Sequence, residues 1–452
     1  MTVTAPAAQR SIPGPRGLPL LGMMPEMIRD MLGLFTNTAR DYGGIAQFKL
    51  LNKDYILVTD PDYIKYILQD NYKNYIRGRS VETGRDLLGN GLPLIDGDFW
   101  LRERRMLQPA FHRERLGKLT ETVISVINTF LQDWAGKANQ NQTLDLDDEM
   151  MRLTLTVIIK AMFSSQLDDK IPSLSHAFNV ASNFMLWRSQ QLWKLPLSVP
   201  LPRHTEYNRA LNVLNDTIYP LITDRRNNPQ DDLLGMMLEM RDAESGEALS
   251  DQQARDEVVT IFFAGHETTA ATLTWAFYLL SQHPEIEERI RAEVQSVLNR
   301  RLPTFADLPR LVYLQQVINE ALRLYPAAYL FAREAVADDV LDGYLIPAKT
   351  MIFISPFVTH RDSKYWPDPE RFDPDRFVSE QVTNRPRHLY FPFGEGPHVC
   401  IGNNFALMEM QLILAMVLQR FHLRLVPKHP IAFKPEATLR PKYGMKMTVE
   451  TI

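Results

Sequence analysis

Apolar and polar positions through the middle of the chain follow the period of an α-helix. Between Pro61 and about Pro326, apolar residues recur every three to four positions, which is typical of helices that bury one face. Prolines at the boundaries support this division, because a helix seldom continues through the residue before a proline. The predicted helices cover residues 97–110, 113–136, 145–164, 173–190, 205–227, 250–281, 284–299 and 310–325, with a last apolar helix at 403–421.

Two short regions have the composition of strands instead. Ala46–Leu50 alternates apolar and polar residues and Tyr55–Thr59 is aromatic and β-branched, so together they predict a hairpin that turns at residues 52–54. Val340–Pro356 is also strand-like, with a turn signal at residues 342–343. The pattern predicts a mainly α fold with small β-sheets.

The chain shows no sign of a division into separate domains. Its 452 residues, 45% of them hydrophobic, contain no Ser/Gly-rich linker, long charge run or repeat. We expect one domain at residues 12–452, preceded by a disordered tail at residues 1–11 that lacks the apolar core of a signal peptide. The most apolar long run, Val258–Leu280, contains Glu267, and a carboxylate is costly inside a bilayer. We therefore expect no membrane span and a cytoplasmic protein.

Composition narrows the functional classes. Lys and Arg total 50 against 54 for Asp and Glu, a net charge of −4, whereas proteins that bind nucleic acid usually carry a basic surplus. We therefore do not expect nucleic acid as a partner. The single cysteine, Cys400, can form no internal disulfide, so any special role for it must come from its surroundings.

Those surroundings favour a metal-binding thiolate. Three glycines and a proline within the ten residues from Phe393 to Gly402 make a tight loop, and a helix is predicted to follow. Cys400 stands at the start of that helix, where backbone N–H groups and the helix dipole favour the thiolate over the thiol. The thiolate is the form that binds iron, and Phe393 can shield the sulfur from water.

The loop resembles the haem-binding signature of the cytochrome P450 family, F-x-x-G-x-R/H-x-C-x-G. Phe393, Gly396, His398, Cys400 and Gly402 occupy its fixed positions, and Arg is more frequent at the position of His398. The resemblance implies a single triangular helical domain that encloses haem b, with Cys400 as the axial ligand of the iron. It also implies that His398 meets a haem propionate, with a charge that depends on pH.

Two further motifs fit the same family as ligands of the haem propionates. Trp100 and Arg104 match W-x-x-x-R, and their spacing puts two donors on one helical face, which suits an anionic group. Arg333 matches another propionate ligand of the family. Taken singly, each of these side chains could equally belong to the edge of an ordinary core.

A third motif predicts structure rather than chemistry. Glu320 and Arg323 form E-x-x-R on one helical face, a spacing that on its own usually indicates a weak surface pair. The segment Pro369–Phe372 contains Arg371. The resemblance implies that Glu320, Arg323 and Arg371 form a buried triad that locks the loop behind the haem.

The middle of the most apolar helix carries an acid beside a hydroxyl, Glu267 and Thr268. Such a pair is costly in a core unless it is hydrogen-bonded or used in the reaction. The resemblance implies that Ala264 contacts the cofactor, that Thr268 supports hydrogen bonds to bound O2, and that Glu267 relays protons. The alternative for Thr268 is a bond back to a helix carbonyl at a packing kink, and for His266 a purely structural role.

The remaining expectations concern the substrate and the electron donor. The resemblance implies an apolar substrate pocket, although its residues could also be ordinary core: Phe184, Trp187, Leu330 and Phe331. Too few residues follow Cys400 for a flavin or iron–sulfur domain, so we expect a separate ferredoxin or flavodoxin with its reductase. An acidic partner could dock on a group of arginines, namely Arg102, Arg104, Arg105, Arg113 and Arg115.

Three functions compete at this point. The favoured one is a monooxygenase that inserts one oxygen atom of O2 into a hydrophobic small molecule, with a fatty acid or a terpenoid as the favoured substrate. The second is a haem-thiolate peroxygenase or isomerase, although such relatives usually lose the acid–hydroxyl pair of Glu267 and Thr268. The third is a non-enzymatic haem carrier or sensor, which has no need of a large pocket beside the haem.

Overall fold

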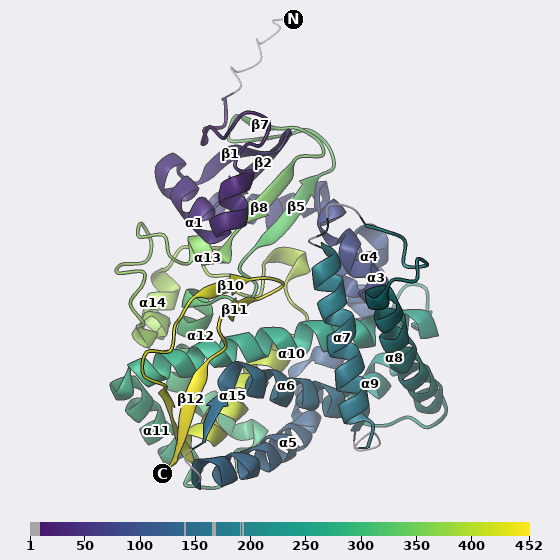
Figure 1. Cartoon of the computed structure of the whole chain (residues 1–452), viewed down its shortest axis with the longest axis vertical. Coiled ribbons are helices and arrows are strands. Elements are labelled where there is room, and N and C mark those ends of the chain that lie inside the picture. The colour runs from purple at the N-terminus through teal and green to yellow at the C-terminus, as the bar shows by residue number, and fades with distance from the viewer. Residues whose placement is uncertain (1–9, 140–141, 165–168, 190, 192–193) are drawn as a thin grey trace, which may run out of the picture. The chain divides into compact units, whose positions relative to one another are not determined.

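The structure is a computed structural model that describes residues 10–139, 142–164, 169–189, 191 and 194–452. Its helices and strands are labelled in Figure 1. The chain forms two compact units: the described part of Met1–Ser80 with Leu322–Cys400, and Val81–Ala321 with Ile401–Ile452. The expectation of a mainly α fold with small sheets is confirmed.

The first unit is built on a five-stranded sheet. Its order is β1 (Ile45–Leu50), β2 (Lys53–Val58), β8 (Met351–Ile354), β5 (Phe331–Ala335) and β3 (Tyr75–Ile76). β1 and β2 form the predicted antiparallel hairpin, but its turn lies at residues 51–52 rather than at 52–54. β2 and β8 run parallel, and the other pairs are antiparallel. These pairings join residues 45–76 and 331–354, which are far apart in sequence, in one sheet.

A second hairpin and the N-terminal segment complete this end of the unit. β6 (Asp339–Leu341) and β7 (Tyr344–Ile346) pair across the turn predicted at residues 342–343. Of the expected tail, residues 1–9 lie outside the described part of the chain. The N–H of Arg10 donates to Gly343 O at 2.9 Å, and its side chain pairs with Asp342.

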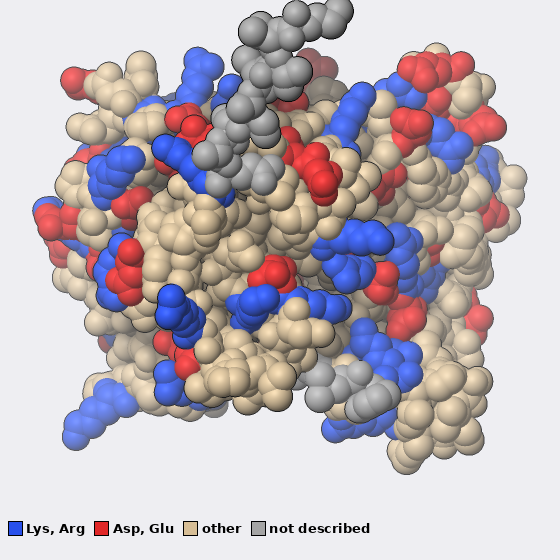
Figure 2. Space-filling model, turned by 90° about the horizontal axis from the view of Figure 1, so that it is seen from above, with Lys and Arg blue, Asp and Glu red and all other residues tan. Residues whose placement is uncertain are grey.

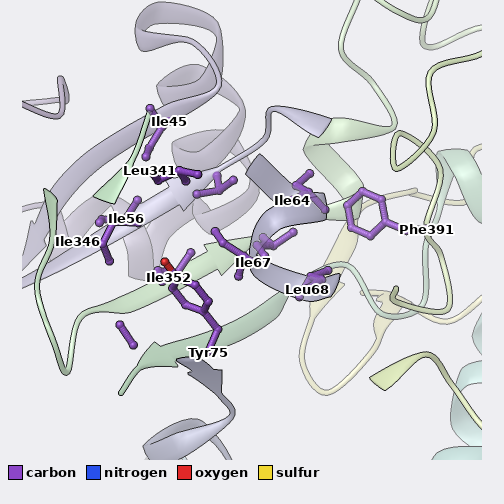
Figure 3. Packing of buried hydrophobic residues seen from close by; sticks show 13 residues of the cluster. Ile45, Ile56, Ile64, Ile67, Leu68, Tyr75, Leu341, Ile346, Ile352 and Phe391 are labelled. Atoms are coloured by element: carbon purple, nitrogen blue, oxygen red, sulfur yellow. The ribbon is translucent and has the colours of Figure 1, made fainter. Parts of the chain in front are cut away.

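One buried cluster of the first unit lies on one side of this sheet. Isoleucines of the sheet, such as Ile56 and Ile352, meet Ile64 and Ile67 from α2 (Pro61–Lys65) and the helical turn Tyr66–Asp70 (Figure 3). Asp60 accepts from the N–H of Asp62 and so caps α2, and Pro61 occupies its first turn. The short helices α13 (Pro356–Thr359) and α14 (Ser379–Asn384) lie in the long C-terminal part of this unit.

Three helices of the first unit were not predicted, namely α1 and the short α13 and α14. α1 (Met24–Tyr42) buries only part of its surface, through Leu32, Leu34, Phe35 and Thr38. Its backbone leaves the helical conformation at Asp30, with φ −157° and ψ 81°.

The second unit holds most of the helices (Figure 1). Those longer than a few residues begin and end close to the predicted positions, except for the unpredicted α9. They are α4 (Gly97–Leu107), α5 (Arg113–Asn139), α6 (Leu146–Phe163), α7 (Ile171–Ser189), α8 (Pro202–Asn227), α9 (Leu233–Glu239), α10 (Asp251–Gln282), α11 (Pro284–Leu298), α12 (Val312–Leu324) and α15 (Asn403–Leu418). The short helix α3 (Arg85–Leu88) precedes α4. The last three residues of α12 belong to the first unit.

Small antiparallel sheets accompany these helices. β4 (Thr143–Asp145), β12 (Lys446–Thr451) and β9 (Phe421–Leu425) form one, and β10 (Phe433–Pro435) pairs with β11 (Leu439–Pro441) in another. α10 packs along α6, and the side chain of Ser250 and that of Gln253 form a capping box at its start. Among the described residues, none of the helices combines the length and the apolarity that a membrane span requires.

Candidate active site

The loop before Cys400 is fixed by its own backbone. The N–H of Cys400 donates to Phe393 O at 2.9 Å, and the N–H of Val399 donates to Gly396 O at 3.1 Å. Gly394 and Gly396 have φ of 74° and 67°, which glycine adopts without steric cost. A Cβ on Gly396 would lie 2.1 Å from the carbonyl oxygen of Leu68. Glycine at position 396 is therefore required by conformation and by close packing.

The start of this loop is anchored in the core of the first unit. The ring of Phe391 is buried and lies beside Ile64 and Leu68 (Figure 3). The N–H of Phe391 donates to Nε2 of His360 at 3.1 Å. Burial holds the pKa of His360 well below its ordinary value, and the neighbouring arginines add to this, so the ring stays neutral and can accept this bond. The loop is thus rigid, while Cys400 itself is exposed.

The structure places one predicted pocket residue against the cysteine loop. A Cβ on Gly394 would touch the ring of Phe331 at 3.7 Å, and the ring centroids of Phe331 and Phe391 are 6.3 Å apart. Leu330, which directly precedes β5, is half-buried. Both residues therefore lie in the first unit, Phe331 at the start of the strand that borders this loop and Leu330 directly before it.

The two predicted propionate ligands of the first unit are also held in place. Arg333 on β5 is buried, with 8% of its surface exposed, and donates to Ala332 O at 2.8 Å. The ring of His398 packs edge-on against Tyr72, with centroids 5.9 Å apart. Both side chains have defined positions in this unit.

Helix α10 in the second unit exposes one small face in the middle of its length. From Ala254 to Leu280, where every residue is described, the residues that are not buried are Phe263, Ala264, Gly265, Thr268 and Tyr278. Ala264 and Thr268 are one helical turn apart and so share a face. Oγ1 of Thr268 donates to Ala264 O at 2.7 Å, which is the back-bonding that the packing alternative predicted. The exposed face is small and apolar apart from this hydroxyl, so it can accept a flat cofactor and a small ligand.

The acid of this helix has a partner that the sequence did not indicate. Glu267 is 6% exposed, and the hydroxyl of Thr438 donates to its Oε1 at 2.8 Å. Burial raises the pKa of Glu267 above its ordinary value, and the bond from Thr438 opposes this only in part. Burial therefore shifts this carboxyl toward the protonated form, which is the form that a proton donor needs. Thr438 is 171 residues away in sequence, and no spacing connects the two.

His266, the neighbour of this acid, is used in packing. Its Nδ1 lies 2.6 Å from Phe262 O, and its ring packs edge-on against Phe178. Burial lowers the pKa of His266 to about 4, so the ring is neutral near neutral pH. These contacts agree with the structural role that the sequence allowed for it.

The other predicted residues of the second unit lie on α4 and α7. Trp100 is buried and Arg104 is half-buried, one turn apart on α4. Phe184 is buried and stacks on Tyr207 with centroids 4.3 Å apart, which makes it part of the packing between α7 and α8. Trp187 is half-buried beneath the guanidinium of Arg203, 4.6 Å from its ring centroid.

The structure corrects one member of the expected triad. Glu320 and Arg323 are fully buried, and Arg323 donates to the carbonyl oxygens of His360 at 2.8 Å and Arg371 at 3.2 Å. The side chain of Arg371, however, is exposed, so Arg371 contributes its backbone and not a buried charge.

A second copy of the same short pattern explains the misassignment. Pro374–Phe377 repeats the proline, arginine and phenylalanine of Pro369–Phe372 five residues later. Its arginine, Arg376, is half-buried, with a buried Nε, and donates to Asp368 O at 2.9 Å. Burial therefore favours Arg376 over Arg371 as the third charge of the network.

The arginines considered for an acidic partner are largely used within the second unit. Arg102 pairs with Glu247 at 3.0 Å, Arg105 with Asp242 at 3.1 Å, and Arg115 with Glu239 at 3.6 Å. Arg113 packs on the ring of Phe305. On the face shown in Figure 2, Lys and Arg are likewise interspersed with Asp and Glu. A docking site for an acidic protein therefore gains no support from these five residues.

Each unit, taken by itself, holds residues of the kind that bind haem. The first unit presents an exposed thiol on a rigid glycine-rich loop, with His398 and Arg333 as donors for anionic groups. The second unit presents Trp100 and Arg104 on one helix and the small exposed face of α10 on another. A thiolate ligand, donors for propionates and a flat apolar surface are what haem b requires.

Comparison with known proteins leads to the same family. The sequence model of the cytochrome P450 family matches residues 12–449. The chain is 35% identical to cyclooctat-9-en-7-ol 5-monooxygenase of Streptomyces melanosporofaciens, covering 91% of this chain and 89% of that protein. It is 32% identical to pentalenene oxygenase of Streptomyces avermitilis, covering 94% and 92%.

Solved structures agree with this assignment. The crystal structure of the cytochrome P450DA haem domain superposes with a TM-score of 0.90 at 27% identity, covering 98% of both chains. The family binds haem b and uses O2 and electrons from a redox partner to oxidise small molecules. The chain therefore belongs to the cytochrome P450 family and is a haem-dependent monooxygenase.

Proposed function

We propose that the enzyme inserts one oxygen atom of O2 into a cyclic terpenoid. The observation that carries this proposal is the similarity, over nine-tenths of the chain, to a protein named for oxidising cyclooctat-9-en-7-ol. A second relative is named for oxidising pentalenene. Neither name concerns a fatty acid, so the terpenoid is favoured over the fatty acid that the sequence also allowed.

In this proposal the thiolate of Cys400 binds the haem iron, and the haem supplies the activation of O2. The backbone of Gly396 and Gly402 shapes the loop, and Phe393 keeps water from the sulfur. Four side chains hold the propionates through donated hydrogen bonds, namely Trp100, Arg104, Arg333 and His398. Ala264 leaves space at the cofactor because its side chain is small and exposed.

The proton supply is assigned to Glu267 and Thr268. Glu267 holds a proton because its carboxyl is buried, and Thr268 presents a hydroxyl on the exposed face of α10. A positioned acid and hydroxyl can pass protons to oxygen at the haem. This pair favours a monooxygenase over a peroxygenase or an isomerase, which need no such supply, and over a non-enzymatic carrier.

The substrate and the electron donor complete the proposal. Phe331 and Leu330 on the strand beside the cysteine loop, with Trp187 and Phe184 on α7, supply apolar contacts for a hydrocarbon. We assign electron delivery to a separate ferredoxin or flavodoxin with its reductase.

A spectral binding screen tests the substrate class. Purified enzyme is titrated with cyclic sesquiterpenes and diterpenes, and in parallel with fatty acids of matched carbon number. We expect terpenoids to shift the Soret band at lower concentrations than the fatty acids, and to be turned over with a surrogate ferredoxin system. Tighter binding and faster oxidation of the fatty acids would overturn the terpenoid assignment.

A further inference from the structure

Two buried acids of the second unit lie beside one arginine. Arg440 on β11 donates from Nη2 to Oδ2 of Asp147 in the first turn of α6. The charge of Arg440 also acts on Glu267 of α10. The hydroxyl of Thr438, directly before β11, donates to the carboxylate of Glu267. The side chain of Asp147 is 5% exposed and that of Arg440 is 24% exposed. Asp147 and Glu267 thus share a cation that reaches the surface.

Charge balance limits how many of these carboxyl groups can be ionised at the same time. If Asp147 and Glu267 were both ionised, one guanidinium would face two carboxylates where little water is available to solvate the excess charge. Three further carboxyls act on this group, namely Glu436, Asp145 and Asp148. Glu436 has its own counter-charge in Lys434 at 3.0 Å, Asp145 has Lys446 at 3.1 Å, and Asp148 is exposed to solvent. One proton is therefore retained by the two buried acids.

The surroundings of the two acids decide where that proton resides. Asp147 has the direct ion pair with Arg440 and lies in the first turn of an 18-residue helix, where the dipole and free N–H groups stabilise an anion. Glu267 lies in the middle of α10 and receives one hydrogen bond from a neutral hydroxyl. Burial raises the pKa of both carboxyls, but Arg440 opposes this rise at Asp147 through its charge and a hydrogen bond, and at Glu267 through its charge alone. The charge is therefore favoured on Asp147 and the proton on Glu267.

One further atom shows that the group can receive protons. Oδ1 of Asp147 is buried, and among the described residues it has no hydrogen-bond partner. A buried carboxylate oxygen without a donor is costly, and a water molecule beside it would satisfy it and can carry protons to the group. Arg440 beside it is exposed enough to contact solvent.

We propose that Asp147, Arg440 and Glu267 form a proton reservoir for O2 activation, in which Arg440 keeps Asp147 ionised so that Glu267 is loaded with the proton it delivers. Thr438 is a positioning residue that orients the Glu267 carboxyl. The inference rests on the proposed relay role of Glu267. When Glu267 releases its proton it becomes a carboxylate, and Arg440 offsets the new charge. A proton from solvent then restores the acid, so one proton moves inward per cycle of the group and no electron is transferred.

The variant Asp147→Asn tests this arrangement while conserving side-chain size. It frees Arg440 to pair with Glu267, which lowers the pKa of Glu267. Infrared difference titration of the haem-loaded protein follows the protonated carboxyl band that Glu267→Gln abolishes. We expect the midpoint of this band to fall by about one pH unit, equal to a tenfold loss of the loaded acid. Product formed per reduced nicotinamide should fall severalfold at neutral pH and recover toward acidic pH.

Arg440 variants supply the opposite shift. Arg440→Gln removes the cation, so the band should persist to higher pH than in the wild type, whereas Arg440→Lys should restore the wild-type midpoint. Asp133→Asn, at an exposed ion pair with Lys137 in the same unit, is the matched control and should change neither readout. If Asp147→Asn does not fold, Arg440→Gln and Arg440→Lys test whether Arg440 controls the protonation of Glu267.

The outcomes separate this inference from the proposed function. If Glu267→Gln forms as much product per reduced nicotinamide as the wild type, the relay role of Glu267 is wrong, and so is the proposed reservoir. If Glu267→Gln uncouples but the midpoint and coupling are unchanged in Asp147→Asn and Arg440→Gln, the reservoir alone is overturned.

Discussion

Cys400 is exposed and Thr268 is half-buried, and both lie on rigid backbone. The loop of Cys400 is closed by its bond to Phe393, and Thr268 sits on a helix buried along most of its length. An exposed polar or sulfur-bearing side chain on a fixed backbone is suited to a ligand or a reaction, because little ordering is needed on binding. These two residues therefore give the most direct tests at the residue scale.

Cys400→Ser should remove thiolate ligation. A serine hydroxyl is a far weaker anion than a thiolate, so the reduced carbon monoxide complex should lose the red-shifted band that is diagnostic of a thiolate ligand. The protein should remain folded, because the loop is held by backbone bonds. Persistence of that band in Cys400→Ser would show that another residue binds the iron.

Thr268→Ala should uncouple electron use from product formation. Haem content and substrate binding should survive, because one small polar group is lost from a partly exposed position. Loss of general-acid assistance costs about 10²–10⁴-fold on the step concerned, so reduced O2 should leave as peroxide. The measurement is product per reduced nicotinamide with peroxide assayed in parallel, and Thr268→Ser is the control that should retain coupling. Equal coupling in Thr268→Ala and the wild type would restore the packing-kink alternative.

At the scale of elements, the sequence predicted those helices whose apolar face is continuous. α10 and α15 bury most of their residues, so their bounds could be found within a few positions. α1, which is kinked at Asp30, was not found. α9 has seven residues, too few for two full periods of a pattern.

Helix α15 contains a buried acid that makes stability depend on pH. Glu409 is fully buried, and burial raises its pKa well above the ordinary value. The unfolded chain releases this proton as pH rises past the ordinary pKa, while the folded chain keeps it, so the wild type loses stability through this range. Glu409→Gln should remove that loss, by up to about 1.4 kcal/mol of unfolding free energy per pH unit.

Denaturant unfolding of the haem-loaded protein across a pH series measures this effect. The exposed Glu121→Gln on α5 is the matched control and should keep the wild-type slope. A wild-type slope in Glu409→Gln would mean that Glu409 is ionised in the folded protein.

At the scale of the whole molecule, local motifs were predictable and long-range partners were not. The cysteine loop and the acid–hydroxyl pair are contiguous in sequence, and a short pattern identifies them. Thr438 and Glu267 are 171 residues apart, and Arg440 and Asp147 are 293 apart, so only folding brings them together. The prediction of Arg371 in the triad was wrong because two segments carry the same short pattern. Arg376 is half-buried and Arg371 is exposed, a difference that the sequence does not show.

The two arginines can be separated by the yield of folded holoprotein. Arg376→Ala should remove the half-buried guanidinium that donates to Asp368 O, and should give less soluble haem-loaded protein than the wild type. Arg371→Ala should be tolerated because its side chain is exposed and only its carbonyl is used. The reverse order of yields would return Arg371 to the buried network.

The central claim is that the enzyme transfers one atom of O2 to a terpenoid, and isotope labelling measures this directly. The cyclic terpenoid that binds most tightly is incubated with the enzyme under ¹⁸O2, with a surrogate ferredoxin and reductase. The mass of the product is then measured by mass spectrometry. We expect one ¹⁸O atom in each product molecule and no product when the reductant is left out. An unlabelled product, or equal product formation from peroxide without O2 and reductant, would contradict it.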